Sequence, residues 1–310
     1  MATSTSESST FTEEWLLGPE DTHFYTRTYT ASSPRAVVLF IHGFAEYVGR
    51  YEWAHGIYSS RGITVFAFDQ RGFGRTGMDE ENRSPGYTYC KTTFREQFAD
   101  IDWALKLVHK RFPKLPIFLM GHSMVWLLSA SGSFPTRTSP PPTQESISLL
   151  SGVVATSPLL VQPSPVPRPV RFVAGMVGKL FPLMLVPAPV NSDALTHDRM
   201  VNEAAEKDPM CPKTVSLKAL DEVLGGCEQV LRKDYKHWPK NLPLLLVHGT
   251  ADKMTSYAAS QEFFAKVDAQ DKEFKAFEDG YHELVHEPDG VKEKFVDECI
   301  TWILAHSKQT

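Results

Sequence analysis

The side chains that could carry chemistry begin with a serine. The stretch GHSM (121–124) directly follows the short apolar run 116–120. A catalytic serine on a sharp turn between a strand and a helix is normally written Gly-x-Ser-x-Gly, because small neighbours let the chain reverse tightly. Ser123 is therefore the candidate nucleophile, although Val125 stands where the second glycine belongs.

A serine nucleophile needs a general base and an acid that orients this base. Asp252 follows the apolar run 243–248, beyond the carboxyl end of a predicted strand, where open α/β sheets gather ligand-facing residues. His282 comes after a further predicted strand and a turn at Asp279-Gly280. The chain order Ser123, Asp252, His282 is the order expected of a triad on such a sheet.

Two nearby residues are alternatives for these roles. His286 lies four residues after His282 and could share a helical face with it, so it is a rival base. Asp279 is a rival acid, but its place beside a glycine suits a turn residue better. We favour His282 because it directly follows the turn, and Asp252 because it lies just beyond the carboxyl end of a predicted strand.

The negative charge that develops on a substrate carbonyl needs two preorganised backbone N–H donors. Met124, directly after the nucleophile, is expected to supply one of them. Phe44, in the segment His42-Gly43-Phe44 after the apolar run 36–41, is the candidate for the other, since Gly43 lets the backbone approach the substrate. The glycines after Asp69 do not form a GxxxxGK phosphate loop and are expected to make a structural turn in which Asp69 and Arg71 tie loops together, so we expect no cofactor and no metal.

The elements that must hold these residues alternate between strands and helices. Residues 23–30 alternate in the manner of a strand, and apolar residues recur at helical spacing over 92–112 and about 291–306. Strands that are apolar throughout and alternate with helices indicate a parallel sheet covered on both faces, which predicts an α/β fold. The apolar runs read as strands are 36–41, 63–68, 116–120, 152–157 and 243–248.

One region interrupts this alternation. Residues 158–169 contain five prolines, and the apolar stretch 172–190 follows them. Roughly fifty residues are too long for a structureless loop in a compact domain, so we predict a cap inserted at about 158–212. The apolar stretch is as long as a membrane span, but Lys179 and three prolines argue against a spanning helix and favour a surface element that contacts lipid. Residues 21–310 are expected to form one domain, after a disordered or poorly ordered N-terminus of residues 1–20.

The amino-acid composition narrows the possible partners and the cellular location of the protein. The 310 residues are 42% hydrophobic and 22% charged, with a formal net charge of −5, so a nucleic acid is not expected as a partner. The four cysteines show neither a CxxC pair nor a disulfide-framework spacing, and the polar N-terminus lacks the basic and apolar regions of a signal peptide. We therefore expect a cytoplasmic protein with reduced thiols.

The longer motifs resemble those of the monoacylglycerol lipases, in the serine-aminopeptidase-like branch of the α/β-hydrolase superfamily. The resemblance rests on IHGFAEYVGRYE (41–52), FDQRGFGRT (68–76), LMGHSM (119–124), LLVHGTADKMTS (245–256) and DGYHELVHEPDG (279–290). It implies the α/β-hydrolase fold, a triad of Ser123, Asp252 and His282, and Phe44 and Met124 as oxyanion donors. It also implies a cap with an apolar face, through which the protein contacts a membrane or lipid droplet peripherally.

The chain departs from that family just after the nucleophile. Where the family reads GHSMGG, residues 124–138 read MVWLLSASGSFPTRT, and the similarity returns only at residue 134. We rank a local reading-frame or splice-boundary error first, ahead of an altered but active turn and of a pseudoenzyme. As written, Val125 and Trp126 add bulk at a close-packed turn, which predicts impaired catalysis.

The leading interpretation is a serine hydrolase that cleaves the ester bond of monoacylglycerols, through an acyl-enzyme, to fatty acid and glycerol. A related carboxylesterase or aminopeptidase is the alternative among enzymes. A non-catalytic lipid-binding protein is the alternative outside them. The apolar stretch 172–190 favours a lipid, whereas a peptidase would place acidic residues around the amine of its substrate.

Overall fold

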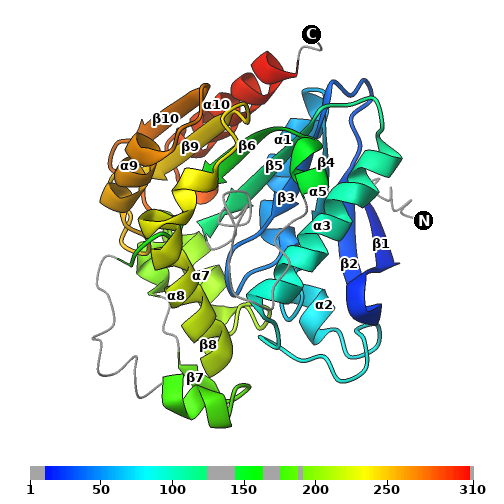
Figure 1. Ribbon diagram of the computed structural model, residues 1–310, viewed down its shortest axis with the longest axis vertical. Coiled ribbons are helices and arrows are strands. Elements are labelled where there is room, and N and C mark those ends of the chain that lie inside the picture. The colour runs from blue at the N-terminus through cyan, green and yellow to red at the C-terminus, as the bar shows by residue number, and fades with distance from the viewer. Residues whose placement is uncertain (1–10, 124–143, 163–174, 188–190, 308–310) are drawn as a thin grey trace, which may run out of the picture.

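The computed structural model describes residues 11–123, 144–162, 175–187 and 191–307. Its main sheet has eight strands in the order β1-β2-β4-β3-β5-β6-β9-β10, and it is parallel from β4 to β10. β2 pairs antiparallel with both β1 and β4. The strands are β1 (Thr12–Leu17), β2 (His23–Tyr29), β3 (Ala36–Ile41), β4 (Ile63–Phe68), β5 (Ile117–His122), β6 (Leu150–Thr156), β9 (Leu244–Gly249) and β10 (Lys272–Phe277). Figure 1 shows β1 at one edge and β10 at the other.

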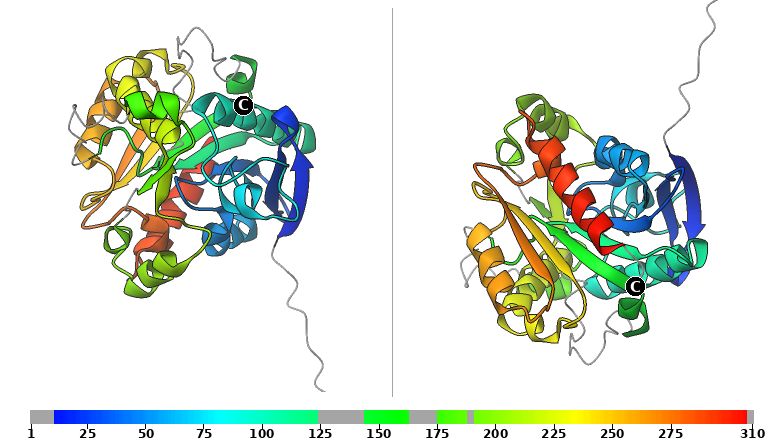
Figure 2. Two further views of the ribbon diagram at one scale, coloured as in Figure 1. Left: turned by 90° about the horizontal axis from the view of Figure 1, so that it is seen from below. Right: turned by 90° about the horizontal axis from the view of Figure 1, so that it is seen from above.

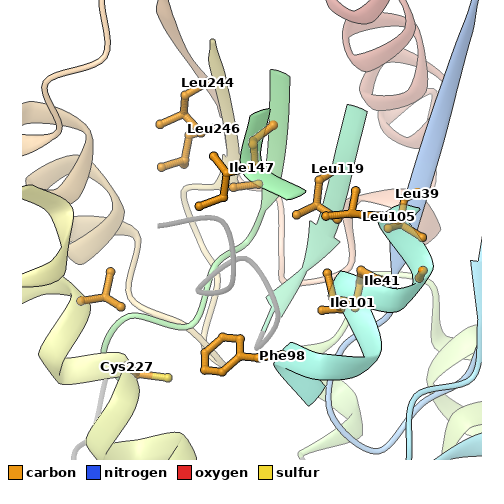
Figure 3. Close-up of a cluster of buried hydrophobic side chains, with 14 of the residues drawn as sticks. Leu39, Ile41, Phe98, Ile101, Leu105, Leu119, Ile147, Cys227, Leu244 and Leu246 are labelled. Carbon is orange, nitrogen blue, oxygen red and sulfur yellow. The ribbon is translucent and has the colours of Figure 1, made fainter. Parts of the chain in front are cut away.

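The central strands are apolar because both faces of the sheet are covered. Every residue of β3, β4, β5 and β9 is buried, and successive side chains point to opposite faces. One face packs against α3 (Phe94–Arg111), α8 (Leu217–Arg232) and α9 (Tyr257–Lys266), as the cluster in Figure 3 shows in part. The other face packs against α1 (Glu52–Ser60) and α10 (Val291–His306), and Figure 2 shows the sheet between the two groups. The predicted α/β fold is thereby confirmed.

The segment of the chain between β6 and β9 includes the predicted cap at about 158–212. It contains β7 (Leu185–Pro187), α7 (Arg199–Lys207) and β8 (Thr214–Ser216), and β7 pairs antiparallel with β8. β7 and β8 lie at the lower left of Figure 1, with α8 beside β8. Within the described part of the apolar stretch, residues 175–180 are helical. No helix among the described residues is long and apolar enough to cross a membrane.

The remaining elements are short. Two are α-helices, α2 (Gly74–Met78) and α5 (Gln144–Ser148). The short 3-10 helices are η1 (Pro19–Asp21), η2 (Val48–Tyr51), η4 (Ser192–Ala194), η5 (Asp234–His237) and η6 (Leu284–His286). η2 and η6 matter for the site, because each follows a loop that carries functional side chains.

One strand differs from the expectation that residues 1–20 are disordered or poorly ordered. β1 occupies residues 12–17 and pairs with β2 along its whole length. Trp15 packs against Tyr25, and Arg111 of α3 lies 2.6 Å from a carboxylate oxygen of Glu14. This edge strand is ordered by contacts with distant parts of the chain, which local composition does not reveal.

Candidate active site

Ser123 stands directly after β5, at the carboxyl edge of the sheet. Its φ is +56°, in the left-handed region that residues other than glycine rarely occupy. Such a conformation costs on the order of 1–3 kcal/mol and persists only where the surrounding structure imposes it. It is the conformation expected of a nucleophile on a sharp turn after a strand.

The turn after β3 packs directly against this serine. A Cβ atom added to Gly43 would lie 3.2 Å from the Ser123 Cβ and 2.7 Å from Glu46 Oε1, so glycine is what permits this approach. The Gly43 N–H donates to the Glu46 carboxylate, whereas the Phe44 N–H donates to no other described residue. Phe44 and Ser123 line the same cavity, so the Phe44 N–H can serve as an oxyanion donor there.

His282 and Asp252 meet between the loops that follow β10 and β9. Their closest atoms, His282 Nδ1 and Asp252 Oδ2, are 2.8 Å apart, and this contact selects the tautomer whose Nε2 is a free base. Burial disfavours the imidazolium, but the Asp252 carboxylate outweighs burial and raises the pKa of His282. Burial also opposes ionisation of Asp252, yet His282 and His248 together hold its pKa well below the usual range.

Further contacts hold this pair, and they were not predicted from the sequence. Asp252 Oδ2 also accepts the Thr255 hydroxyl at 2.7 Å and lies 3.1 Å from His248 Nε2. Asp252 Oδ1 accepts two backbone N–H groups of the following turn, at 2.7 and 2.9 Å. The Ser157 hydroxyl donates to the His282 carbonyl at 2.7 Å. Of these contacts, only that of His248 had a signal in the sequence: a polar residue at the end of the apolar run 243–248, four residues before Asp252.

Ser123 and His282 open onto one cavity, which we call the Ser123 cavity; its empty space of about 1450 Å³ includes part of the open solvent at its mouth. Among the described residues Ser123 makes no hydrogen bond to His282, as is common in catalytic sites without bound substrate. The cavity offers both apolar and charged surface. Its lining includes the apolar residues Leu159, Leu195, Ala205, Val215, Leu220 and Val223, and the charged residues Glu46, Arg50 and Glu283.

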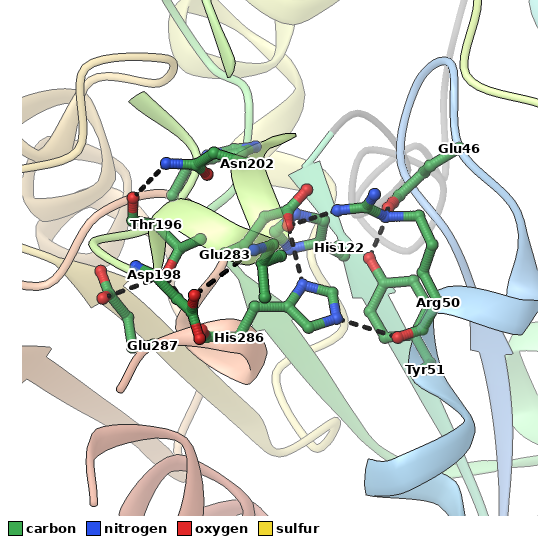
Figure 4. A network of polar contacts seen from close by, with 12 residues as sticks. Glu46, Arg50, Tyr51, His122, Thr196, Asp198, Asn202, Glu283, His286 and Glu287 are labelled. Carbon is green, nitrogen blue, oxygen red and sulfur yellow. Dashed lines mark hydrogen bonds and ion pairs between the residues drawn. The ribbon is translucent and has the colours of Figure 1, made fainter. Parts of the chain in front are cut away.

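Arg50 lies between two buried carboxylates of this lining. Its Nη2 is 2.5 Å from Glu283 Oε2, and its Nε is 3.6 Å from Glu46 Oε2. Tyr51 donates to Glu46 Oε1 at 2.7 Å, and Figure 4 shows the cluster continuing to His286. Burial favours a neutral Glu283, but Arg50 outweighs it and lowers the pKa of that carboxyl. For Glu46, burial and the nearby Glu283 charge raise the pKa.

The rival base and the rival acid have other contacts. His286 Nδ1 lies 2.7 Å from Glu283 Oε2, and its Nε2 lies 2.9 Å from the Arg50 carbonyl, so both ring nitrogens are engaged. Asp279 has a φ of +55° in its turn, and its N–H donates to a threonine hydroxyl at 2.9 Å. Neither residue lines the Ser123 cavity.

Three residues singled out in the sequence lie outside the described residues: Met124, Val125 and Trp126. The second expected oxyanion donor and the unusual turn are among them. In the part of the chain that is described, no group of three or more His, Cys, Asp or Glu side chains could hold a metal ion.

Comparison with known proteins relates this geometry to a family. A family model described as serine aminopeptidase, S33, matches residues 32–289. A candidate monoglyceride lipase of Schizosaccharomyces pombe is 31% identical over 92% of this chain and 72% of its own length. A monoacylglycerol lipase of Mycolicibacterium smegmatis is 28% identical over 96% of this chain and 99% of its own length.

The fold has close counterparts among solved structures. A soluble variant of the monoglyceride lipase from Saccharomyces cerevisiae, solved with a substrate analogue, matches 99% of this chain and 97% of its own length. The TM-score is 0.81 at 21% sequence identity, which shows a shared fold. Since the family model spans the strands from β3 to β10 and the loops that carry Ser123, Asp252 and His282, this chain belongs to the S33 serine aminopeptidase family and has the α/β-hydrolase fold.

Proposed function

We propose that this chain is a serine hydrolase that cleaves the ester bond of monoacylglycerols and releases a fatty acid and glycerol. His282 Nε2 takes the proton of Ser123 Oγ as this oxygen attacks the ester carbonyl. The N–H groups of Phe44 and Met124 hold the oxyanion of the tetrahedral intermediate. His282 returns the proton to the leaving glycerol oxygen, and a water deprotonated by the same histidine then hydrolyses the acyl-enzyme.

The mixed lining of the Ser123 cavity is the observation that carries this proposal. A monoacylglycerol joins a long apolar chain to a small headgroup with two hydroxyls. Leu195, Val215 and Leu220 offer apolar surface for the chain, whose burial is favourable. Glu46 and Arg50 offer hydrogen-bonding groups for the hydroxyls. The relatives named as monoglyceride and monoacylglycerol lipases support the same substrate class.

An aminopeptidase is the alternative that the family description suggests. Such an enzyme needs a carboxylate to bind the ammonium group of its substrate. The acids that line the Ser123 cavity, Glu46 and Glu283, already flank Arg50. Glu46 also accepts hydrogen bonds from the Gly43 N–H and the Tyr51 hydroxyl. These contacts leave little free negative charge, which favours an uncharged substrate.

Exposed apolar residues of the cap region support access to the substrate from a lipid surface. We call them the cap patch: Met176, Leu180, Phe181, Leu183, Met184 and Leu185. Clustered apolar side chains of this kind mark interaction sites. In this proposal the cytoplasmic protein docks its cap patch peripherally on a membrane or lipid droplet and draws a monoacylglycerol into the cavity.

Fluorophosphonate labelling and product release test the proposed function together. The parent chain should be labelled, Ser123→Ala should lose the label, and Ser60→Ala, an exposed serine on α1, should keep it. The labelled enzyme should release fatty acid from a monoacylglycerol emulsion and leave an aminoacyl p-nitroanilide intact. Preference for the anilide would support the aminopeptidase. A folded but unlabelled parent would support the non-catalytic lipid-binding protein.

A further inference from the structure

A buried carboxylate outside the triad joins the loop of the candidate catalytic histidine to the cap region. Glu287 is 1% exposed and follows His282 by five residues. Its Oε1 accepts the N–H of Tyr281, the residue directly before His282, at 2.6 Å. Its Oε2 accepts the His197 N–H at 3.0 Å and the Thr196 hydroxyl at 3.2 Å. The Glu287 side chain thus binds the segment around His197, which lies 90 residues earlier in the chain.

Neighbouring contacts strengthen this attachment. The Thr196 hydroxyl shares its one hydrogen between Glu287 and the His286 carbonyl, which lies 2.9 Å from its oxygen, and the Glu283 N–H donates to the Leu195 carbonyl at 2.8 Å. Figure 4 shows Thr196 and Glu287 together at one end of the polar network. The backbone on both sides of His282 is therefore tied to residues 195–197.

Other contacts also hold His282. Asp252 contacts its Nδ1, Thr255 Oγ1 lies 3.4 Å from the same atom, the Ser157 hydroxyl binds its carbonyl, and its ring packs against that of His122. We propose that Glu287 is a positioning residue for His282, which fixes the preceding peptide so that the imidazole stays between Asp252 and Ser123. This inference rests on the proposed function, in which Ser123 is the nucleophile and His282 is its base.

The physical reason lies in the accuracy that a general base requires. A displacement of about 1 Å at the reacting atoms can cost on the order of 10²-fold in rate. Glu287 accepts N–H and O–H donors from Tyr281, His197 and Thr196, and its Oε2 also lies 3.0 Å from His197 Nδ1. An amide in its place turns an NH₂ group toward one of these donors and leaves a buried donor unpaired. The peptide of Tyr281 is then free to turn, and His282 moves with it.

Three variants test this role with a water-soluble p-nitrophenyl ester. Glu287→Gln should lower kcat about 10–100-fold with KM within twofold of the parent, because positioning affects chemistry more than binding. Thr196→Val removes one donor to Glu287 and should lower kcat about 2–10-fold. Asp198→Ala is the control: Asp198 lies in the same segment but caps α7 through the Met200 and Val201 N–H groups, so kcat should stay within twofold.

The titration of His282 gives a second readout that needs no activity. It can be followed by NMR of histidine-labelled protein and assigned with His282→Gln. In the parent, burial lowers the pKa of His282, but Asp252, together with the nearby charges of Glu283 and Glu46, raises it above its ordinary value. In Glu287→Gln this pKa should fall toward the ordinary value, because His282 Nδ1 is no longer held at hydrogen-bond distance from Asp252. The pKa of His282 in Asp198→Ala should match that in the parent.

The two readouts separate the two proposals. If the parent protein is not labelled by the fluorophosphonate, the proposal that it is a serine hydrolase is overturned. The titration of His282 then decides whether Glu287 positions that histidine. A folded Glu287→Gln protein that matches Asp198→Ala in either kcat or the His282 pKa would overturn the positioning role. Should Glu287→Gln fail to fold, the same comparison of Thr196→Val with Asp198→Ala decides the question.

Discussion

Asp252 Oδ2 lies 2.8 Å from His282 Nδ1, and both side chains are buried at the carboxyl edge of the sheet. The carboxylate orients the imidazole and stabilises the imidazolium that forms during attack by the serine. Asp252→Asn keeps the shape but favours the wrong tautomer. We expect kcat on a monoacylglycerol to fall about 10³–10⁴-fold, while Asp279→Asn stays within twofold. Comparable losses in both variants would contradict the assignment of the acid.

The same pair determines the acid side of the pH profile. A general base works only when it is unprotonated, so kcat/KM falls as the pH decreases through the pKa of His282. Although burial works against it, Asp252 raises this pKa above the ordinary value of about 6.5. The midpoint of the acid limb should therefore lie above about pH 6.5 in the parent and move to lower pH in Asp252→Asn. A parent midpoint below the ordinary value would argue against His282 as the base.

Gly43 and Ser123 approach so closely that one methyl group should matter. An alanine Cβ at position 43 would meet Glu46 Oε1 at 2.7 Å and the Ser123 Cβ at 3.2 Å. We expect Gly43→Ala to lower the free energy of unfolding by about 1–3 kcal/mol and, by shifting the Phe44 N–H, kcat by about 10²-fold. Gly56→Ala on α1, whose added Cβ meets nothing within 4 Å, should retain parent activity and be at least as stable as the parent, because alanine favours a helix interior over glycine. Similar losses at both glycines would refute the steric argument.

His55 on α1 should contribute to acid unfolding. It is buried against the rings of Tyr29 and Phe40, and neither of its ring nitrogens has a hydrogen-bond partner among the described residues. Burial lowers its pKa from 6.5 to about 3. The pKa of His55 is thus lower in the folded than in the unfolded chain. Below about pH 6.5 the unfolded chain takes up a proton that the folded chain does not, so the free energy of unfolding decreases as the pH falls from about 6.5 toward 3.

His55→Phe should remove this pH dependence while keeping the ring packing. On lowering the pH from about 6.5 to about 4, both proteins should lose stability. The loss in the free energy of unfolding of His55→Phe should be smaller than that of the parent, by on the order of 3 kcal/mol. Urea unfolding at a series of pH values measures the difference. His109→Phe, an exposed histidine of α3, should keep the parent slope. If His55→Phe also keeps it, His55 does not drive acid unfolding.

Val125 and Trp126 follow the nucleophile where the family pattern has glycines. Large side chains at a close-packed turn displace backbone, and small displacements near a reacting atom are costly. We expect the double variant Val125→Gly/Trp126→Gly to hydrolyse a monoacylglycerol emulsion faster than the parent, by up to about 10²-fold. Adding Ser123→Ala should abolish activity in both backgrounds. Equal rates for parent and double variant would show that the turn tolerates this bulk.

The cap patch should control binding to lipid surfaces. Leu180 is 77% exposed and Phe181 60% exposed. Burying such side chains contributes about 1.5–3 kcal/mol each, so Leu180→Ser/Phe181→Ser should weaken cosedimentation with phosphatidylcholine vesicles at least tenfold. Hydrolysis of a water-soluble ester should be unchanged. Leu17→Ser, at a 61% exposed leucine of β1, should bind vesicles as the parent does. Equal binding by the parent and both variants would show that the cap patch does not bind lipid surfaces.

The sheet could be predicted because its central strands are apolar along their whole length. The runs 36–41 and 63–68 coincide with β3 and β4, and the helical pattern over 291–306 coincides with α10. β1 was missed because its residues, TEEWLL, mix polar and apolar side chains and sit at an edge. An edge strand of that composition becomes ordered only when a partner such as β2 lies beside it.

The sequence by itself determined which side chains could react, because Ser123 directly follows one strand, Asp252 lies just beyond another, and the carboxyl ends of these strands must meet at one edge of a parallel sheet. Only the tertiary structure decided what surrounds them. The ion pair of Arg50 with Glu283 and the hydrogen bond of Thr196 to Glu287 join segments far apart in the chain. Burial makes such contacts strong and their loss costly, and burial is a property of the folded molecule rather than of any local stretch of sequence.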